Sequence, residues 1–465
     1  MFLRRRQESL ASAPMLKDDY PGLDFLGLQD ILRAKTRWYK TLWLVVLIVN
    51  TVLGLLCTAQ IVIEYLATPT ATLISYKSTG KMLLPQVTVC GTVPDHTNFD
   101  DFYRFAVHQL QREENSTLLH VLVYILAGSG FQKFDHVVLA WNESYIDETL
   151  TPIYEQLRGN MTAKEFFHFG QDAFGFQCSD LFQQCKLGEE DLDCCQIFKP
   201  TYTIRRGKCF RSQELYQSSY DEMGKLGLRF KEPKKLFPSL SGQELMIFLN
   251  EYKTDIDPFP RNYMYAHDFN KFRVRATRMQ LIQRDGVCEN ENEIGKSTCY
   301  LEKWLIEHVE QRFNCAYPYM DTLRDTNGVE PCEPSVIVKN YARAVQGDGY
   351  DAHDCKLACN RTEYDIGIER TDSDFSKAPY KYRADINYND LQYQRIEEVN
   401  TITLLGLISQ LGGQLGLFLG TSVIDVVQLG LILSIVASRY AKTVMYGEPD
   451  TASITKVRLE TPKLQ

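Results

Sequence analysis

Residues 410–429 read QLGGQLGLFLGTSVIDVVQL, and this stretch decides the fold of the chain. It is apolar, yet it contains glycines at positions 412, 413, 416 and 420. Glycine lowers helical propensity and lets another backbone or an ion approach the main chain. The spacing of 412, 416 and 420 is also that of a Gly-xxx-Gly face at which membrane helices pack. The glycines alone therefore leave a packing face and a pore lining as equal interpretations.

Polar side chains in the same stretch favour the pore lining. Ser422, Asp425 and Gln428 recur every third residue, so they share one face of a helix. A carboxylate that faces lipid costs at least about 2.5–3.5 kcal/mol, so Asp425 should face a helix bundle or a water-filled cavity. In a symmetric oligomer, these residues would form rings of oxygen atoms that replace the hydration shell of a cation. A proton relay and an assembly contact are the alternatives for this aspartate.

Apolar residues gather near both ends of the 465-residue chain. Residues 42–63 are almost free of charge, and residues 404–437 carry Asp425 as their single ionisable side chain. Both stretches reach the roughly 20 apolar residues that a membrane helix needs. A cleaved signal peptide is the alternative for the first stretch, but its apolar part would be shorter and nearer to the terminus.

Basic residues flank the two apolar stretches on their outer sides: Arg33, Lys35, Arg37, Lys40, Arg439 and Lys442. The positive-inside rule therefore places both termini in the cytoplasm. We expect a multi-pass protein of the plasma membrane with a cytoplasmic N-terminus, a first transmembrane helix, an extracellular domain, a second transmembrane helix with the pore and a cytoplasmic C-terminus, over residues 1–41, 42–63, 64–401, 402–438 and 439–465.

Cysteines and glycosylation sequons support an extracellular position for the central stretch. Twelve of the thirteen cysteines lie there, an even number that suits disulfides in an oxidising compartment. Cys57 lies in the first apolar stretch, and we expect it to be a free thiol. All four sequons fall between the two apolar stretches, at Asn115, Asn142, Asn160 and Asn360.

The central stretch is expected to form one lobed α+β domain, with a central β-sheet and peripheral helices. Apolar residues at three- and four-residue spacing predict helices, and β-branched or alternating runs predict strands. The expected helices are 102–110, 118–126 and 299–313, and the expected strands are 83–90, 245–249, 272–282 and 383–393. The first and last of these strands adjoin the membrane helices, and we expect them to pair in one sheet.

The net charge is compatible with cation binding, and the missing motifs argue against several classes of enzyme. The formal net charge is −8 although both ends are basic, so the extracellular part is more acidic than the whole chain. Such a surface concentrates cations, although a solvated acidic surface is an equally good interpretation. Zinc-protease, serine-hydrolase and phosphate-loop motifs are missing, and the eight histidines are scattered. We expect no enzymatic activity, no cofactor, no metal site and no nucleic-acid partner.

The chain resembles the degenerin/epithelial sodium channel superfamily, as an invertebrate-like member. Several segments carry the resemblance: Gly412–Ser422, Leu84–Cys90, Gly207–Phe210, Tyr317–Tyr319 and Cys359–Tyr364. The first of them looks like the family's second-span signature, which ends in a Gly-x-Ser selectivity filter. The resemblance implies a trimeric channel with two membrane helices and a large disulfide-rich extracellular domain.

The family's disulfides imply four pairs, which are Cys90–Cys209, Cys288–Cys359, Cys299–Cys355 and Cys315–Cys332. Cys178 and Cys185 would then pair with Cys194 and Cys195, in an order that the resemblance leaves open. Two further disulfides that are usual in the family's thumb lack both partners here, so no orphan thiol remains.

The resemblance also implies residue roles. Gly420, Thr421 and Ser422 would form the selectivity filter, and the pore lining would include Ser409, Gly416, Asp425 and Gln428. The family's cytoplasmic His-Gly gating motif is represented by Leu26-Gly27, so the role of that histidine is missing. Thr421 is larger than the usual filter residue, and Gln428 replaces the family's acidic residue below the filter. Bulky side chains at Ser409 are expected to hold the channel open.

The expected function is that of a pore-forming subunit of a sodium-permeable channel, as a homo- or heterotrimer blocked by amiloride. Gating by a ligand, by protons or by mechanical load and constitutive opening all remain open, and no extracellular ligand can be named. One alternative is a non-conducting accessory subunit of a heteromeric channel. A less favoured alternative is a two-span channel of the ATP-gated type, which lacks the glycine signature of the second span.

Overall fold

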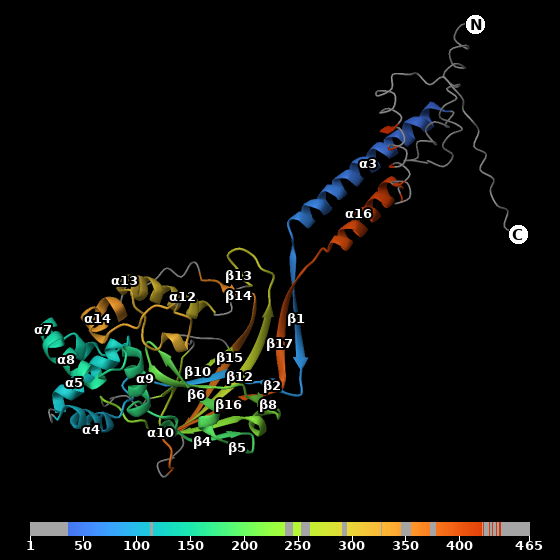
Figure 1. The fold of residues 1–465 in the computed structure, drawn as a ribbon. Helices are drawn as coiled ribbons and strands as arrows, with labels where there is room; N and C mark the ends of the chain where they lie inside the picture. The colour runs from blue at the N-terminus through green and yellow to red at the C-terminus, as the bar shows by residue number, and fades with distance from the viewer. Residues whose placement is uncertain are drawn as a thin grey trace, which may run out of the picture. The chain divides into compact units, whose positions relative to one another are not determined.

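The computed structural model describes residues 36–438 except 112–114, 238–244, 253–260, 291–294, 327, 346–354, 373–377, 421, 423–426, 428–429, 431–433 and 435–436. The chain divides into two compact units. One unit comprises Met1–Ala71 and Asn400–Gln465, and the other comprises Thr72–Val399. Figure 1 shows the helices and strands of both units.

The larger unit contains an eight-stranded sheet in the order β1-β17-β12-β16-β9-β4-β5, with β15 also paired to β12. Its strands are β1 (Thr70–Ser78), β4 (Phe182–Leu187), β5 (Glu190–Leu192), β9 (Leu226–Phe230), β12 (Asp268–Gln280), β15 (Asn360–Asp372), β16 (Tyr382–Tyr388) and β17 (Gln392–Asn400). Strand β12 forms as expected because Phe272, Val274 and Ala276 alternate with more exposed residues and bury one face.

A second sheet has the strand order β11-β10-β3-β7-β6. Its strands are β3 (Gln86–Gly91), β6 (Phe198–Thr203), β7 (Gly207–Ser212), β10 (Leu245–Asn250) and β11 (Asn262–Met264). Residues 245–249 of β10 are fully buried, as the continuous apolar run LMIFL predicts. Two short pairs complete the strands: β2 (Met82–Leu83) with β8 (Tyr216–Gln217), and β13 (Cys288–Glu289) with β14 (Leu357–Ala358).

The predicted pairing of strand 83–90 with strand 383–393 is wrong. Strand β3 pairs with β10 and β7, whereas β16 lies in the eight-stranded sheet. The segment 383–393 is also two strands, because the chain turns between Tyr388 and Gln392. The side chain of Gln217 holds this turn: its amide donates to the Tyr388 carbonyl at 2.9 Å, and its oxygen accepts from the Tyr388 amide at 2.8 Å.

Most helices of the larger unit gather at one end (Figure 1), whereas the short helices at residues 178–181 and 194–197 contact strands β4 and β6. The helices of this unit are α4 (Phe99–Leu110), α5 (Asn115–Gly128), α6 (Asp135–Val138), α7 (Glu143–Tyr145), α8 (Thr151–Arg158), α9 (Ala163–Ala173), α10 (Cys178–Leu181), α11 (Cys194–Ile197), α12 (Lys296–Leu305), α13 (Gln311–Phe313), α14 (Pro334–Lys339) and α15 (Tyr341–Val345). The expected helix 299–313 is interrupted by a π-helical turn, Ile306–Glu310. Another π-helical turn, Ile146–Leu150, precedes α8, and short 3-10 turns cover Asp221–Gly224 and Met320–Thr322.

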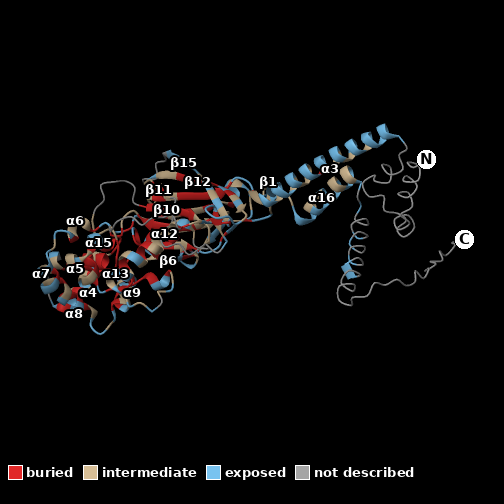
Figure 2. Ribbon diagram, turned by 90° about the horizontal axis from the view of Figure 1, so that it is seen from above, coloured by how far each residue is buried: buried red, intermediate tan, exposed pale blue. Residues whose placement is uncertain are grey.

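Two large apolar cores stabilise the larger unit, one among the helices and one between the sheets (Figure 2), and a small third cluster surrounds Cys90 and Cys209. Aromatic pairs are frequent in the helical core, and one stacked pair is Phe131 and Tyr319, whose ring centroids are 5.0 Å apart. Gly130 belongs to this core: its φ is +88°, and an added Cβ would lie 2.3 Å from the Tyr317 ring. Only glycine fits there.

The smaller unit contains the helices α3 (Arg37–Leu66) and α16 (Leu404–Leu419). They pack side by side where Gly54 of α3 meets Phe418 of α16. An added Cβ at Gly54 would lie 3.1 Å from the Phe418 Cβ, so the missing side chain permits the close approach. Gly54 is the buried residue of α3.

Candidate ion pore

The helix α16 has defined ends at both sides of the glycine-rich segment. At its start, the Thr403 hydroxyl accepts a hydrogen bond from the Gly406 amide at 3.1 Å, which caps the helix. At its end, Gly420 adopts a left-handed conformation with φ of +65°, and its amide donates to the Gly416 carbonyl at 3.1 Å. A side chain would strain this conformation, so Gly420 ends the helix two residues before Ser422.

The glycines of α16 lie on one helix face together with Ser409. Counted from Ser409, Gly412, Gly413, Gly416 and Gly420 lie at i+3, i+4, i+7 and i+11. All five positions are exposed, and an added Cβ at 412, 413 or 420 would meet nothing within 4 Å. We call this face the glycine face, and at positions 412, 413 and 420 it does not contact α3 of the same copy.

The other expected pore residues are only partly placed. Ser422 is exposed, whereas Thr421, Asp425 and Gln428 lie outside the described residues, as does Gly27. Beyond the break at Gly420, the described residues Val427, Gly430, Ser434, Ala437 and Ser438 are again helical. The second span, expected over residues 402–438, is thus interrupted at Gly420, where the sequence also predicts a break.

Helix α3 is the helix in the described part of the chain that is long and apolar enough to cross a membrane. It extends beyond the expected range 42–63 to Arg37 and Leu66. Two of its polar side chains donate to carbonyls of the same helix: Asn50 to Val46 at 2.9 Å and Thr51 to Leu47 at 2.8 Å. Such internal pairing suits an apolar medium, in which water offers no partner.

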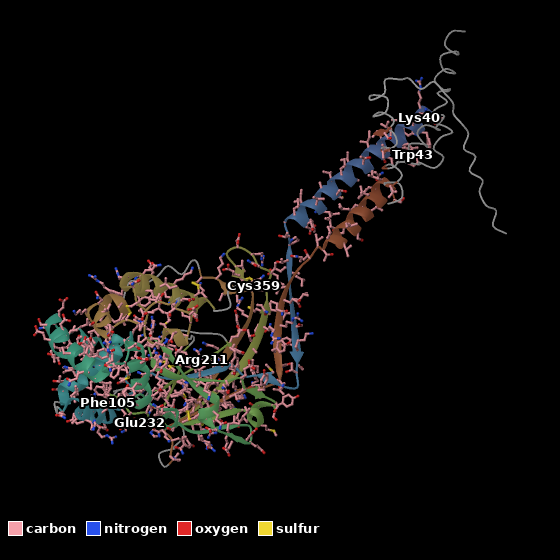
Figure 3. All side chains as sticks on the ribbon, in the orientation of Figure 1. Lys40, Trp43, Phe105, Arg211, Glu232 and Cys359 are labelled. Carbon is pink, nitrogen blue, oxygen red and sulfur yellow. A yellow bond between two sulfur atoms is a disulfide. The ribbon has the colours of Figure 1, made fainter. Side chains whose placement is uncertain are left out.

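The ends of α3 carry residues typical of a membrane surface. Lys40 and Trp43 lie near the start of the helix (Figure 3), where Trp38 is 79% exposed. Tyr65 lies at the opposite end. Aromatic and basic side chains are enriched where a membrane helix meets the headgroups, so this distribution fits a helix that spans the bilayer.

The two chain segments beside α3 and α16 are tied together within the smaller unit. Thr401 donates its amide to the Pro69 carbonyl at 3.0 Å and its hydroxyl to the same oxygen at 2.9 Å. Pro69 directly precedes β1, and Thr401 directly follows β17. The strands next to the two helices are β1 and β17, which are neighbours in the eight-stranded sheet, rather than the strands expected from the sequence.

Strand β17 is also anchored inside the larger unit. Residues 394–397 pair with β12 in parallel. The buried carboxylate of Glu398 accepts from the Ile282 amide at 3.1 Å and forms an ion pair with Arg284. The guanidinium of Arg395 donates to the side-chain oxygen of Gln280 at 2.7 Å. These contacts fix the strand from which α16 continues.

The twelve extracellular cysteines form six disulfides. The four pairs that the resemblance implies are all formed: Cys90–Cys209, Cys288–Cys359, Cys299–Cys355 and Cys315–Cys332. The order left open is Cys178–Cys195 and Cys185–Cys194. Cys57 is a free thiol. Figure 3 labels Cys359, which precedes β15.

The sequon asparagines that the structure describes in full are accessible. Asn142, Asn160 and Asn360 are exposed, and the Asn142 side chain also caps α7 by accepting from the Tyr145 amide at 2.8 Å. Asn115 is the first residue of α5. An attached glycan requires an exposed asparagine, so these positions are compatible with glycosylation. Glycosylation itself stays a prediction.

Two histidines among the helices have shifted pKa values. Partial burial lowers the pKa of His120, whose Nδ1 lies 2.9 Å from the Tyr145 hydroxyl. Burial also lowers the pKa of His168. The negative charge of Asp321 acts in the opposite direction and offsets part of this shift. Both rings are therefore favoured in the neutral form when the unit is folded.

The family model of the amiloride-sensitive sodium channel matches residues 24–431, which covers most of the chain and the whole described part of the glycine face. The chain belongs to this family. It is therefore an ion channel subunit and not an enzyme. The match confirms the resemblance that the sequence motifs suggested.

Named relatives of this amiloride-sensitive sodium channel family member are channels too. The human bile acid-sensitive ion channel is 22% identical over 449 residues, which cover 87% of this chain and 83% of the relative. The acid-sensing ion channel 1B of Danio rerio is 32% identical over 94 residues, 16% of each chain. A solved proton-activated chloride channel aligns with a TM-score of 0.30 and 7% identity over 83% of this chain and 95% of its own. A score this low indicates neither a shared fold nor a shared activity.

Several contacts of the site had not been predicted from the sequence. Thr403 could have been found, because a threonine directly before an apolar helical run is a common cap. The bond from Thr401 to Pro69 and the ion pair of Glu398 join residues far apart in the chain, and no local pattern marks such contacts.

Proposed function

We propose that this chain is the pore-forming subunit of a sodium-permeable cation channel of the plasma membrane. Three copies, identical or related, surround one pore, and each contributes α3 and α16 as membrane helices with both termini in the cytoplasm. The observation that carries the proposal is the left-handed Gly420, which ends α16 immediately before Thr421 and Ser422. A helix that only anchors a protein gains nothing from such a break.

The glycine face supplies the second argument. An added Cβ at Gly412, Gly413 or Gly420 would meet no described atom within 4 Å, so these positions have room for water, an ion or another copy of α16. At the break, carbonyl groups lose their helical partners and can coordinate a cation. Gly420, Thr421 and Ser422 are the proposed filter, and Ser409, Gly416, Asp425 and Gln428 line the path beside it.

The extracellular unit would control the pore through β1 and β17. Both strands continue into the membrane helices, and the contacts of Glu398 and Arg395 hold β17 against the larger sheet. A stimulus that moves this sheet would therefore pull on α16. The stimulus itself is left open, and block by amiloride is an expectation from the family name.

The decisive experiment is voltage clamp of cells that express the full chain, alone and with a related subunit. External sodium is replaced first by potassium and then by N-methyl-D-glucamine. We expect an inward current with sodium that disappears with the bulky cation. Surface expression without a cation current under both conditions would contradict a pore-forming role and favour an accessory subunit.

The substitution Asp425→Asn tests the pore lining. It should lower the single-channel conductance by about two- to tenfold, because a ring of charges that concentrates cations is lost. Asp425→Glu is the matched control, since it keeps the charge and should retain most of the conductance. An unchanged conductance in Asp425→Asn would remove this residue from the permeation path.

The substitution Ser409→Trp tests the gate. Ser409 lies at the start of the glycine face, where a large side chain would prevent neighbouring copies from closing together. We expect a raised resting current. The neighbouring Gln410→Trp is the control off this face, and equal currents in both variants would contradict a gate at Ser409.

A further inference from the structure

A cavity of about 460 Å³ lies within the extracellular unit. It is lined by parts of the β1–β2 turn, β8, β12, β15 and β17, together with the residues after β10. Its volume falls in the range of about 300–1,000 Å³ that is typical of sites for small organic ligands. The pore described above does not include any of its residues.

Two cations line this cavity without a carboxylate partner in the described part of the chain. The Lys81 ammonium lies 4.8 Å from the centroid of the Tyr216 ring, and the Arg278 guanidinium lies 5.0 Å from that of Tyr393. Cation–π contacts hold both groups in position but do not neutralise them. Both side chains are exposed, so an incoming anion can reach them.

The one acidic side chain of the lining is already engaged. Glu251 accepts a hydrogen bond from the Thr362 amide at 3.0 Å. The lining contains the two cations Lys81 and Arg278 and this single carboxylate, so it carries one net positive charge. The cavity therefore favours an anionic ligand over a cationic one.

Tyrosine rings form much of the remaining wall: Tyr216, Tyr252, Tyr364, Tyr388 and Tyr393. Burial raises the pKa of Tyr252 to about 12 and also raises that of Tyr388, so these groups stay neutral. The Tyr388 hydroxyl donates to the Leu83 carbonyl at 2.8 Å, and that of Tyr252 donates to the Gln213 carbonyl at 3.0 Å. With these hydroxyls occupied, the rings offer apolar and stacking surface.

We propose that this cavity binds a small organic anion with a flat apolar body, whose acidic group contacts Lys81 and Arg278. The site is placed to act on the channel, because Tyr393 belongs to β17 and Lys81 follows β1. The same two segments are linked inside the unit, where the Thr79 amide donates to the Leu391 carbonyl at 2.9 Å. A bound ligand would bridge the strands that continue into α3 and α16.

The test measures binding by isothermal titration calorimetry on the purified full chain in lipid nanodiscs. The probe is 2-naphthalenesulfonate, and its neutral counterpart is 2-naphthalenesulfonamide. We expect saturable binding of the sulfonate at one site per chain, at least about tenfold tighter than that of the sulfonamide, since a charged hydrogen bond is lost in the latter.

Variants assign the binding to this cavity. Arg278→Gln and Lys81→Gln should each weaken sulfonate binding by about tenfold. The control variants are Arg275→Gln and Lys77→Gln. Arg275 lies on β12 like Arg278, Lys77 lies on β1, and both residues are exposed and do not line the cavity. Both control variants should bind the sulfonate like the wild type. Thermal unfolding of each variant verifies that the unit is folded.

Three results would overturn the proposal: no saturable binding, equal binding of the neutral probe, or equal losses in the cavity and control variants. The last result would indicate that the probe enters the lipid or binds the surface by charge alone. Because no current is measured, failure here leaves the proposed pore untouched, and a silent pore leaves the binding result valid.

Discussion

The extracellular unit and the membrane unit differ in how far their apolar side chains are buried. In the extracellular unit, large aromatic residues such as Tyr317, Tyr319 and Phe131 are buried almost completely, and six disulfides link its segments. In the membrane unit, Gly54 is the buried residue of α3, and α16 has none. Side chains such as Leu55 and Ile63 are 64% and 67% exposed.

The difference in burial shows which unit covers its apolar surface by itself. The extracellular unit buries two large apolar cores within one copy, so most of its stability should be a property of the single chain. Helix α3 leaves its apolar surface uncovered, as expected of a helix whose side chains face lipid or the other copies of the proposed channel.

The largest effect should come from removing the longest disulfide loop of the extracellular unit. The double substitution Cys90→Ala and Cys209→Ala opens a loop with a sequence separation of 119, and Cys315→Ala with Cys332→Ala opens one of 17. The chain-entropy relation gives losses of about 5 and about 3 kcal/mol, because the longer loop restricts the unfolded chain more. Denaturant unfolding of the full chain in detergent measures both, and equal losses would show that chain entropy does not set this stability.

The next effect compares one glycine from each unit. Gly130→Ala should destabilise the extracellular unit by about 2–4 kcal/mol, since it adds strain at positive φ and overlaps the Tyr317 ring. Gly412→Ala meets nothing in its own copy and should change folding by less than about 1 kcal/mol.

The same pair separates folding from assembly. If the glycine face meets another copy or the ion path, Gly412→Ala should alter the current under voltage clamp although the chain remains folded. If both variants lowered the thermal unfolding temperature equally, Gly412 would be as important for folding as Gly130, which would contradict the difference between the two units. A current unaffected by Gly412→Ala would leave the glycine face without a partner.

The smallest effect concerns pH and belongs to the extracellular unit. Because burial lowers the pKa of His120, the folded state favours the neutral ring. Its contribution to stability is present above the unfolded pKa of about 6.5 and is lost as the pH falls below that value. His120→Gln should therefore reduce the drop in Tm between pH 7.5 and pH 5.5 by about 1–2 °C. The exposed His108→Gln is the control, and an equal reduction there would rule out His120 as the source.

Sequence reasoning succeeded where the evidence is local or periodic. The apolar stretch that became α3, the alternation in β12 and the buried run in β10 follow from side-chain periodicity, because each face must find its own environment. The helix break at Gly420 is equally local, since a left-handed residue favours glycine. The disulfide pairs came from the family resemblance and not from spacing.

Sequence reasoning failed where partners lie far apart in the chain. Strand β3 was expected beside residues 383–393, yet it pairs with β10 and β7, because many apolar strands satisfy the same pattern and only the whole fold selects among them. The turn at 389–391 depends on Gln217, which precedes it by more than 170 positions. The cavity unites β8, β12, β15 and β17, and no single segment could predict it.

The two hydrogen bonds from Thr401 to Pro69 have a mechanical consequence. One carbonyl oxygen accepts both hydrogen bonds, so in the proposed channel a load on either strand would be shared between α3 and α16. If α3 and α16 both cross the bilayer as proposed, a stimulus must move the two helices together or first break these hydrogen bonds.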